Sequence, residues 1–255
     1  MIARRPLLVL AGFLALWQAV VWLTGVPPFM LPPPVAVLRS LADHAGLLAY
    51  HALVTSGEIL AGLLLGVIVG AASALAMALI PALQPWMLPP LVLGQAIPVF
   101  ALAPILVLWL GYGMVSKVAM AVLIIYFPVT AALFDGLRRT DPGWLDLAHT
   151  MGASPLRTLW HLRLPAALPA FGSGLRIAAA VAPIAAVVGE WVGSGAGLGY
   201  LMLHANGRSQ TALMFAAMVV LMAIALGLYV LIDRLLLHLT PWAPHSLALP
   251  NGRNP

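Results

Sequence analysis

The chain contains no cysteine, and only 7% of its 255 residues are charged. The lack of thiols excludes disulfide bonds, thiolate metal sites and cysteine nucleophiles. The scarcity of charge excludes an ordinary soluble domain, because hydrophobic residues make up 63% of the chain and the mean hydropathy is +1.05. Most of the chain is therefore expected to face lipid or other membrane-spanning segments.

A glycine-rich phosphate-binding loop is also missing from the sequence. Any use of ATP must therefore depend on another subunit. The net charge of +5 does not predict a nucleic-acid partner, because the twelve lysines and arginines are scattered near the ends of apolar segments. Such scattering is typical of a signal for membrane topology.

Long uncharged stretches predict six transmembrane helices in a single transmembrane domain over residues 1–255. The first follows Arg4 and Arg5, is longer than the apolar region of a signal peptide, and lacks a small-residue cleavage site after it, so we expect it to be retained. No charge occurs from Ile59 to Ser116, which is enough for two crossings with a turn near Pro81–Pro85. The predicted spans are residues 7–24, 58–80, 87–110, 118–134, 174–191 and 211–232.

Six spans place both termini on one side of the membrane, and the basic residues indicate which side. With cytoplasmic termini, the basic residues on the inside are Arg4, Arg5, Arg138, Arg139, Arg157, Arg163, Arg176, Arg234 and Arg253. Those on the outside are Arg39, Lys117 and Arg208. Nine against three satisfies the positive-inside rule, so we predict a multi-pass protein with both termini in the cytoplasm.

Two segments connect the first two spans. Residues 26–34 (VPPFMLPPP) are too rich in proline for a helix and predict an extended connector. A polyproline ligand for a recognition module is the alternative interpretation of this segment. Residues 35–50 then predict a short amphipathic segment.

A polar insert, residues 138–165, interrupts the apolar pattern between the fourth and fifth spans. Asp141-Pro142 and Ser154-Pro155 each pair an N-cap residue with a proline at the first helical position, and Gly152 is suited to end a helix. We therefore expect two short helices joined by a tight turn at Gly152 and Ala153. The apolar residues predicted to share a face are Trp144, Leu145, Ala148 and Met151 in the first helix, and Leu156, Leu159 and Trp160 in the second.

Helical periodicity leaves two interpretations of the insert open. It can dock on a soluble partner, or it can lie as an amphipathic helix pair on the lipid surface, which its Trp and Arg content suits equally well.

The spacing of the insert supplies a resemblance that favours the first interpretation. Asp146-Leu147-Ala148, Gly152 after three more residues, and Leu162-Arg163-Leu164-Pro165 after nine more resemble the "EAA" signature of ABC-importer permeases. In that signature Glu-Ala-Ala, a glycine and Ile-x-Leu-Pro form the loop that docks on the ATPase. Asp replaces Glu and two Leu replace Ala and Ile here, while the spacing is intact.

Other segments extend the resemblance over nearly the whole chain. Ser173–Arg176 is similar to the start of the helix after the docking loop, and Gly189-Glu190 with Gly195–Tyr200 resembles the external loop of permeases for nitrate, sulfonate and taurine. Within that family, Gln95–Phe100 and His204–Gly207 most resemble permeases for a pyrimidine precursor of thiamine, the hydroxymethylpyrimidine branch.

The resemblance implies an all-α, MetI-like transmembrane domain of a type I ABC importer in a bacterial inner membrane. Two copies would form the pathway, two ATPase subunits would bind ATP and Mg beneath them, and an external binding protein would deliver a small organic solute. This chain would bind no cofactor and no metal, and would not be an enzyme. The implied ATPase-coupling residues are Asp146, Ala148, Met151, Gly152, Ala153, Ser154, Leu162, Leu164 and Pro165.

Polar residues within the spans are candidates for the pathway or its gate. Glu190 lies near the outer end of the fifth span, where it either contacts solute or accepts hydrogen bonds from loop amides. Gln95, beside Pro98 in the third span, either lines the pathway or binds a neighbouring helix. Glu58 is expected to cap the start of the second span.

Small residues suggest how the second span packs. Gly62, Gly66 and Gly70 are spaced by four, which predicts one face for close helix packing.

Two other classes of protein were weighed against a permease. A membrane hydrolase would use Ser194 as the nucleophile and His204 as its base, but no third orienting group is identifiable. A secondary transporter or channel is the stronger alternative. Such proteins commonly show paired halves with broken helices and intramembrane charges, and no such repeat is visible in the sequence.

Overall fold

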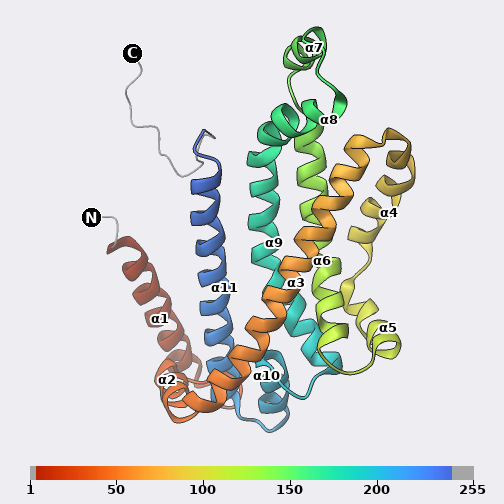
Figure 1. Cartoon of the computed structure of the whole chain (residues 1–255). Coiled ribbons are helices and arrows are strands. Elements are labelled where there is room, and N and C mark those ends of the chain that lie inside the picture. The colour runs from red at the N-terminus through yellow and green to blue at the C-terminus, as the bar shows by residue number, and fades with distance from the viewer. Residues whose placement is uncertain (1–3, 243–255) are drawn as a thin grey trace.

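The computed structural model describes residues 4–242 and contains only helices and their connections over that range (Figure 1). The α-helices are α1 (Arg4–Thr24), α2 (Pro34–Asp43), α3 (Ala45–Leu79), α4 (Gln84–Ala96), α5 (Val99–Leu110), α6 (Met114–Arg138), α7 (Pro142–Thr150), α8 (Pro155–Thr158), α9 (Leu164–Gly193), α10 (Leu198–Gly207) and α11 (Thr211–Leu239). A 3₁₀ turn, η1 (Pro81–Leu83), precedes α4, and a π-helical turn, η2 (Leu159–Arg163), joins α8 to α9. This is the all-α fold that the sequence predicts.

The centre of the bundle is formed by α3, α6 and α9, with α6 packed along both of the others and α11 packed against α9. Figure 1 shows α7 beyond one end of these helices and α10 at the opposite end, and these are called the α7 end and the α10 end below. Helix α11 runs from the α10 end to the α7 end (Figure 1). Buried apolar clusters lie in the middle of the bundle and toward each end.

Glycines allow α3 and α6 to approach closely, as predicted. A Cβ atom on Gly62 would overlap the methyl group of Ala121, and one on Gly66 would lie 2.7 Å from Cγ2 of Ile125. Gly70 is similarly close to the side chain of Val129. The glycine face of α3 is therefore a packing surface for α6.

Four helical segments are long and apolar enough to cross a membrane. They are Ala45–Leu79, Met114–Arg138, the continuous stretch Pro155–Gly193 and Thr211–Leu239. The bent pair Pro81–Ala96 and Val99–Leu110 supplies a further candidate, and Leu8–Thr24 is a shorter apolar helix. Four of the six predicted spans therefore lie on helices long enough to cross a membrane, the third lies on the bent pair and the first on the shorter helix, so the count of six stays a prediction.

Two predictions about the first half of the chain are wrong. Residues 35–50 do not form one amphipathic segment, because α2 ends at Asp43 and Tyr50 already belongs to α3. As a result α3 begins thirteen residues before the predicted span at residue 58, since nothing between Ala45 and Gly57 breaks the helix. The connector over residues 26–34 is free of regular helix until Pro34, as expected, and it is held by a 2.6 Å hydrogen bond from the Thr211 hydroxyl to the Phe29 carbonyl.

The prediction of one straight helix over residues 87–110 is also wrong. Helices α4 and α5 meet at an angle of 106°, with extended conformations at Ile97 and Pro98. The cause is local, because a residue that precedes proline is disfavoured in the α conformation. Gln95 therefore lies in the last turn of α4 rather than in mid-span, and its amide reaches the Leu91 carbonyl of its own helix at 3.5 Å.

Candidate functional site

The polar insert forms a helical elbow, defined here as α7, the turn at residues 151–154, α8 and η2. Both predicted N-caps are present. The Asp141 carboxylate accepts a hydrogen bond from the Gly143 amide at 2.7 Å, and the Ser154 hydroxyl accepts one from the Arg157 amide at 3.4 Å. The two short helices therefore begin where their capping residues predict.

Gly152 is the residue that makes the turn of the elbow possible. Its φ is +70°, and the Ala153 amide donates to the Ala148 carbonyl at 2.9 Å, which is the pattern of a helix terminated by a left-handed glycine. No atom lies within 4 Å of the position that a Cβ atom on Gly152 would occupy. Backbone conformation, rather than crowding within this chain, therefore favours glycine here.

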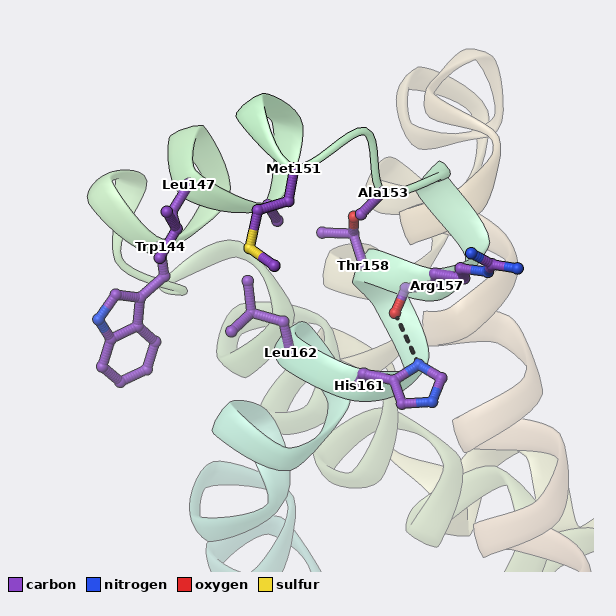
Figure 2. Close-up of a pocket in the computed structure, with 9 residues that line it drawn as sticks. Trp144, Leu147, Met151, Ala153, Arg157, Thr158, His161 and Leu162 are labelled. Carbon is purple, nitrogen blue, oxygen red and sulfur yellow. Dashed lines mark hydrogen bonds between the residues drawn. The ribbon is translucent and has the colours of Figure 1, made fainter.

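The two arms of the elbow enclose an open, mostly apolar hollow of about 700 Å³. Figure 2 shows Met151 pointing across it toward Leu162 and Trp144 at its edge. Arg157 and His161 bring polar groups to the opposite arm, where the His161 ring contacts the Arg157 carbonyl at 3.1 Å. The lining residues are Trp144, Leu147, Ala148, Met151, Ala153, Arg157, Thr158, His161 and Leu162.

The apolar faces of the elbow differ from those that helical periodicity predicts. Leu147, not Leu145, lines the hollow beside Ala148, and α7 buries none of its residues. On the second arm Leu159 is buried in the core of the α7 end, whereas Leu156 and Trp160 are about half exposed. The π-helical turn η2 is the physical reason on this arm, because a wider turn changes the angular position of the residues that follow α8.

The predicted coupling residues occupy the elbow and the start of the next helix. Asp146, Ala148, Met151, Gly152, Ala153 and Ser154 lie in α7 or the turn, Leu162 lies in η2, and Leu164 and Pro165 form the first turn of α9. The second arm continues through η2 into α9 without a break, so it is the start of a long helix rather than a separate one. The coupling role of these residues stays a prediction.

Arg163 anchors the base of the elbow to the bundle. Its Nε and Nη2 atoms donate to the Leu137 carbonyl at 3.2 and 3.1 Å. Leu137 lies in the last turn of α6, whose carbonyls have no partner within the helix, so the guanidinium acts as a cap. No local signal in the sequence predicts this contact, because the two residues are 26 positions apart.

A second group of functional side chains, the buried polar cluster, lies at the opposite end of α9. It comprises Thr55 and Glu58 of α3, Lys117 of α6, Glu190 of α9 and Ser194 just after α9. Glu58 forms an ion pair with Lys117, and the Lys117 ammonium also donates to the Ser194 hydroxyl at 3.0 Å. Both charged side chains are almost completely buried.

One sequence-based assignment is therefore wrong, because Glu58 lies in the interior of α3 and does not cap a helix start. Lys117, counted above among the outside basic residues, is a buried ion-pair partner, a role that its sequence position did not predict. The residues are 59 positions apart in the chain. Their pairing depends on the packing of α3 against α6, which no local signal in the sequence reveals.

Glu190 holds the loop between α9 and α10. Its carboxylate accepts hydrogen bonds from the Thr55 hydroxyl at 2.6 Å, from the Gly199 amide and from the Tyr200 amide at 3.3 Å. A Cβ atom on Gly197 would overlap the Glu190 carboxylate. The predicted alternative of hydrogen bonds to loop amides is thus observed, while a gating or pathway role for Glu190, Gln95 and Pro98 stays a prediction.

The geometry does not support the serine hydrolase. The Ser194 hydroxyl donates to the Ala196 carbonyl and accepts from Lys117, and no hydrogen bond joins it to His204 among residues 4–242. His204 instead packs against the ring of Tyr200, with 4.2 Å between centroids. A nucleophile that requires a positioned imidazole is therefore absent from this arrangement.

Comparison with known proteins finds relatives that match over nearly the whole chain. Over 232 residues the chain is 58% identical to a probable ABC transporter permease protein of Haemophilus influenzae, covering 91% of this chain and 95% of that protein. It is 36% identical to the formylaminopyrimidine transport permease protein ThiX of Halalkalibacterium halodurans, covering 94% of this chain and 96% of the relative. The taurine transport system permease protein TauC of Escherichia coli is 31% identical, with 91% and 87% covered.

A solved structure shows the same fold. The crystal structure of an amino acid ABC transporter with histidines superposes with a TM-score of 0.61, covering 80% of this chain and 98% of that chain at 16% identity. The family model of the binding-protein-dependent transport system inner membrane component matches residues 59–243. The chain therefore belongs to this family, the membrane-spanning permease subunits of ABC importers.

Proposed function

We propose that this chain passes a small organic solute from an external binding protein into the cytoplasm, driven by ATP hydrolysis in a separate ATPase subunit. A pyrimidine precursor of thiamine or a sulfonate-like or taurine-like compound is the proposed solute. The names of the similar permeases for formylaminopyrimidine and taurine support these two classes.

The elbow is the proposed docking site for the ATPase, and its exposed apolar surface is the observation that carries this proposal. Trp144, Leu147 and Met151 are 56%, 60% and 77% exposed. They surround a hollow that the other residues of the described range leave open. Apolar surface gathered on a protruding helix is typical of an interface with another protein.

The elbow is also built to transmit motion. Its second arm continues into α9, which extends to Gly193 beside the buried polar cluster. A displacement of the elbow by the ATPase would therefore tilt a helix that runs to the opposite end of the bundle (Figure 1). Alternating access follows if ATP and the loaded binding protein prefer different tilts, because a ligand shifts an equilibrium only by its differential affinity for the two states.

The proposed assembly has two copies of this chain, two ATPase subunits and one binding protein. The α7 end and both termini would lie in the cytoplasm, and the α10 end would lie outside. The excess of arginine on the side of the termini supports this orientation.

A glycine substitution in the turn tests the docking proposal. We expect Gly152→Arg to abolish stable association with the ATPase and permease-stimulated ATP hydrolysis, because the new side chain occupies the docking surface. Gly25→Arg is the matched control. Gly25 has a φ of +61° and the same open surroundings, but it follows α1 at the α10 end, so the variant carries similar backbone strain without touching the elbow.

Membrane insertion of both variants would be checked first, followed by copurification of the ATPase and its turnover in lipid. A Gly152→Arg protein that retains its ATPase and transports at the parental rate would overturn the proposal. The elbow would then be a helix pair on the lipid surface.

A further inference from the structure

Four aromatic and imidazole rings form a continuous row at the α10 end. Tyr50 and His51 come from α3, and Tyr200 and His204 come from α10. Successive ring centroids are 5.2, 6.0 and 4.2 Å apart, in the order Tyr50, His51, Tyr200, His204. The first two spacings lie within the range of interacting aromatic pairs, and the third is slightly shorter.

The inner rings of this row are held in place by the buried polar cluster and its loop. The Gly197 amide donates to Nδ1 of His51 at 2.9 Å, which places the proton of a neutral imidazole on Nε2. Tyr200 is fixed through its backbone amide, which donates to Glu190. The Tyr200 side chain makes no hydrogen bond within the described residues, and the backbone contact sets its position.

Part of the row is accessible. Tyr50 is 57% exposed, His204 is exposed and Tyr200 is partly exposed, whereas His51 is buried behind them. Ordered rings that are partly exposed are a favourable surface for stacking a planar ligand, because little conformational entropy is lost on binding. Stacking of this kind accepts any flat π system.

The row carries no charge of its own beyond its imidazoles. Within residues 4–242 the single cation placed over an aromatic ring is Arg138, above Phe134 at the α7 end. Arg208 follows α10 and is the basic residue nearest to the row in the chain, but it is stacked on none of its rings. A sulfonate is recognised by charge-assisted hydrogen bonds, which the four rings do not supply.

We infer that the row formed by Tyr50, His51, Tyr200 and His204 is a stacking site for an uncharged, planar heteroaromatic solute. The inference rests on the proposed function, which places the α10 end outside. It selects the pyrimidine class over the sulfonate class among the solutes proposed above. The site would receive the solute from the binding protein before it enters the pathway.

The full-length chain in lipid nanodiscs provides the test, with saturation-transfer NMR to detect weak binding. Formylaminopyrimidine and taurine serve as probes at equal concentration. We expect the parental chain to bind the pyrimidine and not taurine. Tyr200→Leu should weaken pyrimidine binding about tenfold, since one stacking ring is lost, and Tyr200→Phe should restore it.

Tyr112→Leu is the control for loss of an exposed tyrosine. Tyr112 is 83% exposed next to α5 and belongs to no ring pair in the described part of the chain. This variant should bind the pyrimidine like the parental chain. Unchanged binding by Tyr200→Leu, an equal loss in Tyr112→Leu, or preferential binding of taurine would each overturn the stacking site.

ATPase docking and turnover, measured in the same nanodiscs, distinguish a failure of this inference from a failure of the proposed function. If the ATPase docks and its turnover is stimulated, but no pyrimidine binding depends on Tyr200, the stacking site is wrong and the permease function stands. If the ATPase fails to dock on the parental chain, the proposed function is wrong, whatever binds to the rings.

Discussion

The elbow and the buried polar cluster lie at opposite ends of α9. The elbow exposes apolar side chains, whereas the cluster buries charged ones. At the α7 end, large apolar side chains such as Met151 are exposed around an open hollow. At the α10 end, Glu58, Lys117 and Glu190 are buried. Exposed apolar side chains at the α7 end and buried charged side chains at the α10 end are both unfavourable in an isolated helix bundle.

The difference indicates whether each region finds its partners within this chain or in another protein. The polar cluster is nearly complete within this chain, because Glu190 and Lys117 have their partners in α3 and the α9–α10 loop, and only Oε2 of Glu58 is buried without a partner. Within residues 4–242 the apolar surface of the elbow has no such partner. We therefore expect substitutions in the cluster to change stability, and substitutions in the elbow to change association.

The largest effect on stability is expected at the ion pair. Lys117→Met leaves the Glu58 carboxylate buried without its cation, which costs about 3 kcal/mol or more. The double variant Glu58→Gln with Lys117→Met should recover most of this loss, because no unpaired charge remains. Thermal unfolding in detergent would be measured for the parental chain, for each single variant and for the double variant.

The double-mutant cycle decides whether the pair acts as a unit. Coupling of the two substitutions is the expected result. Strictly additive effects would show that Glu58 and Lys117 do not depend on each other, and the contrast with the elbow would lose its main support.

A smaller effect on stability, but a large one on association, is expected in the elbow. Leu147→Ser should change the free energy of unfolding by no more than about 0.5 kcal/mol, because the side chain is already exposed. Its affinity for the ATPase should fall about tenfold, since a central apolar contact of the interface is removed. Titration of the ATPase onto the chain in nanodiscs measures this change.

Leu156→Ser is the matched control for Leu147→Ser. Leu156 is 54% exposed and lies in α8, but it does not line the hollow. Its substitution should leave both stability and ATPase affinity close to parental. If the two variants lose affinity equally, the hollow is not the focus of the docking surface.

The smallest effect on function is expected at Ser194. Ser194→Ala removes the hydroxyl that accepts from Lys117 and from the Ala196 amide, which costs about 1 kcal/mol. Solute uptake should persist, because no catalytic role is assigned to this residue. Complete loss of uptake by a folded Ser194→Ala protein would favour the hydrolase that the geometry argues against.

The elbow was largely predictable from sequence because its signals are local. The caps at Asp141 and Ser154 and the left-handed Gly152 depend on residues within one turn of the chain. The bend at Ile97 had a local signal too, in the proline that follows it. It was missed because hydropathy measures how apolar a segment is and contains no information on backbone direction.

By itself the sequence determined that this is an apolar, helical membrane protein, with a capped elbow of defined spacing and a glycine face on α3. These features follow from composition, from capping and from periodicity, each of which acts over a few residues. Only the tertiary structure decided that Glu58 meets Lys117, that Glu190 accepts a hydrogen bond from Thr55, and that four rings from α3 and α10 form one row. The physical reason is that these contacts depend on neighbours brought together by helix packing, such as residues 59 or 135 positions apart in the chain.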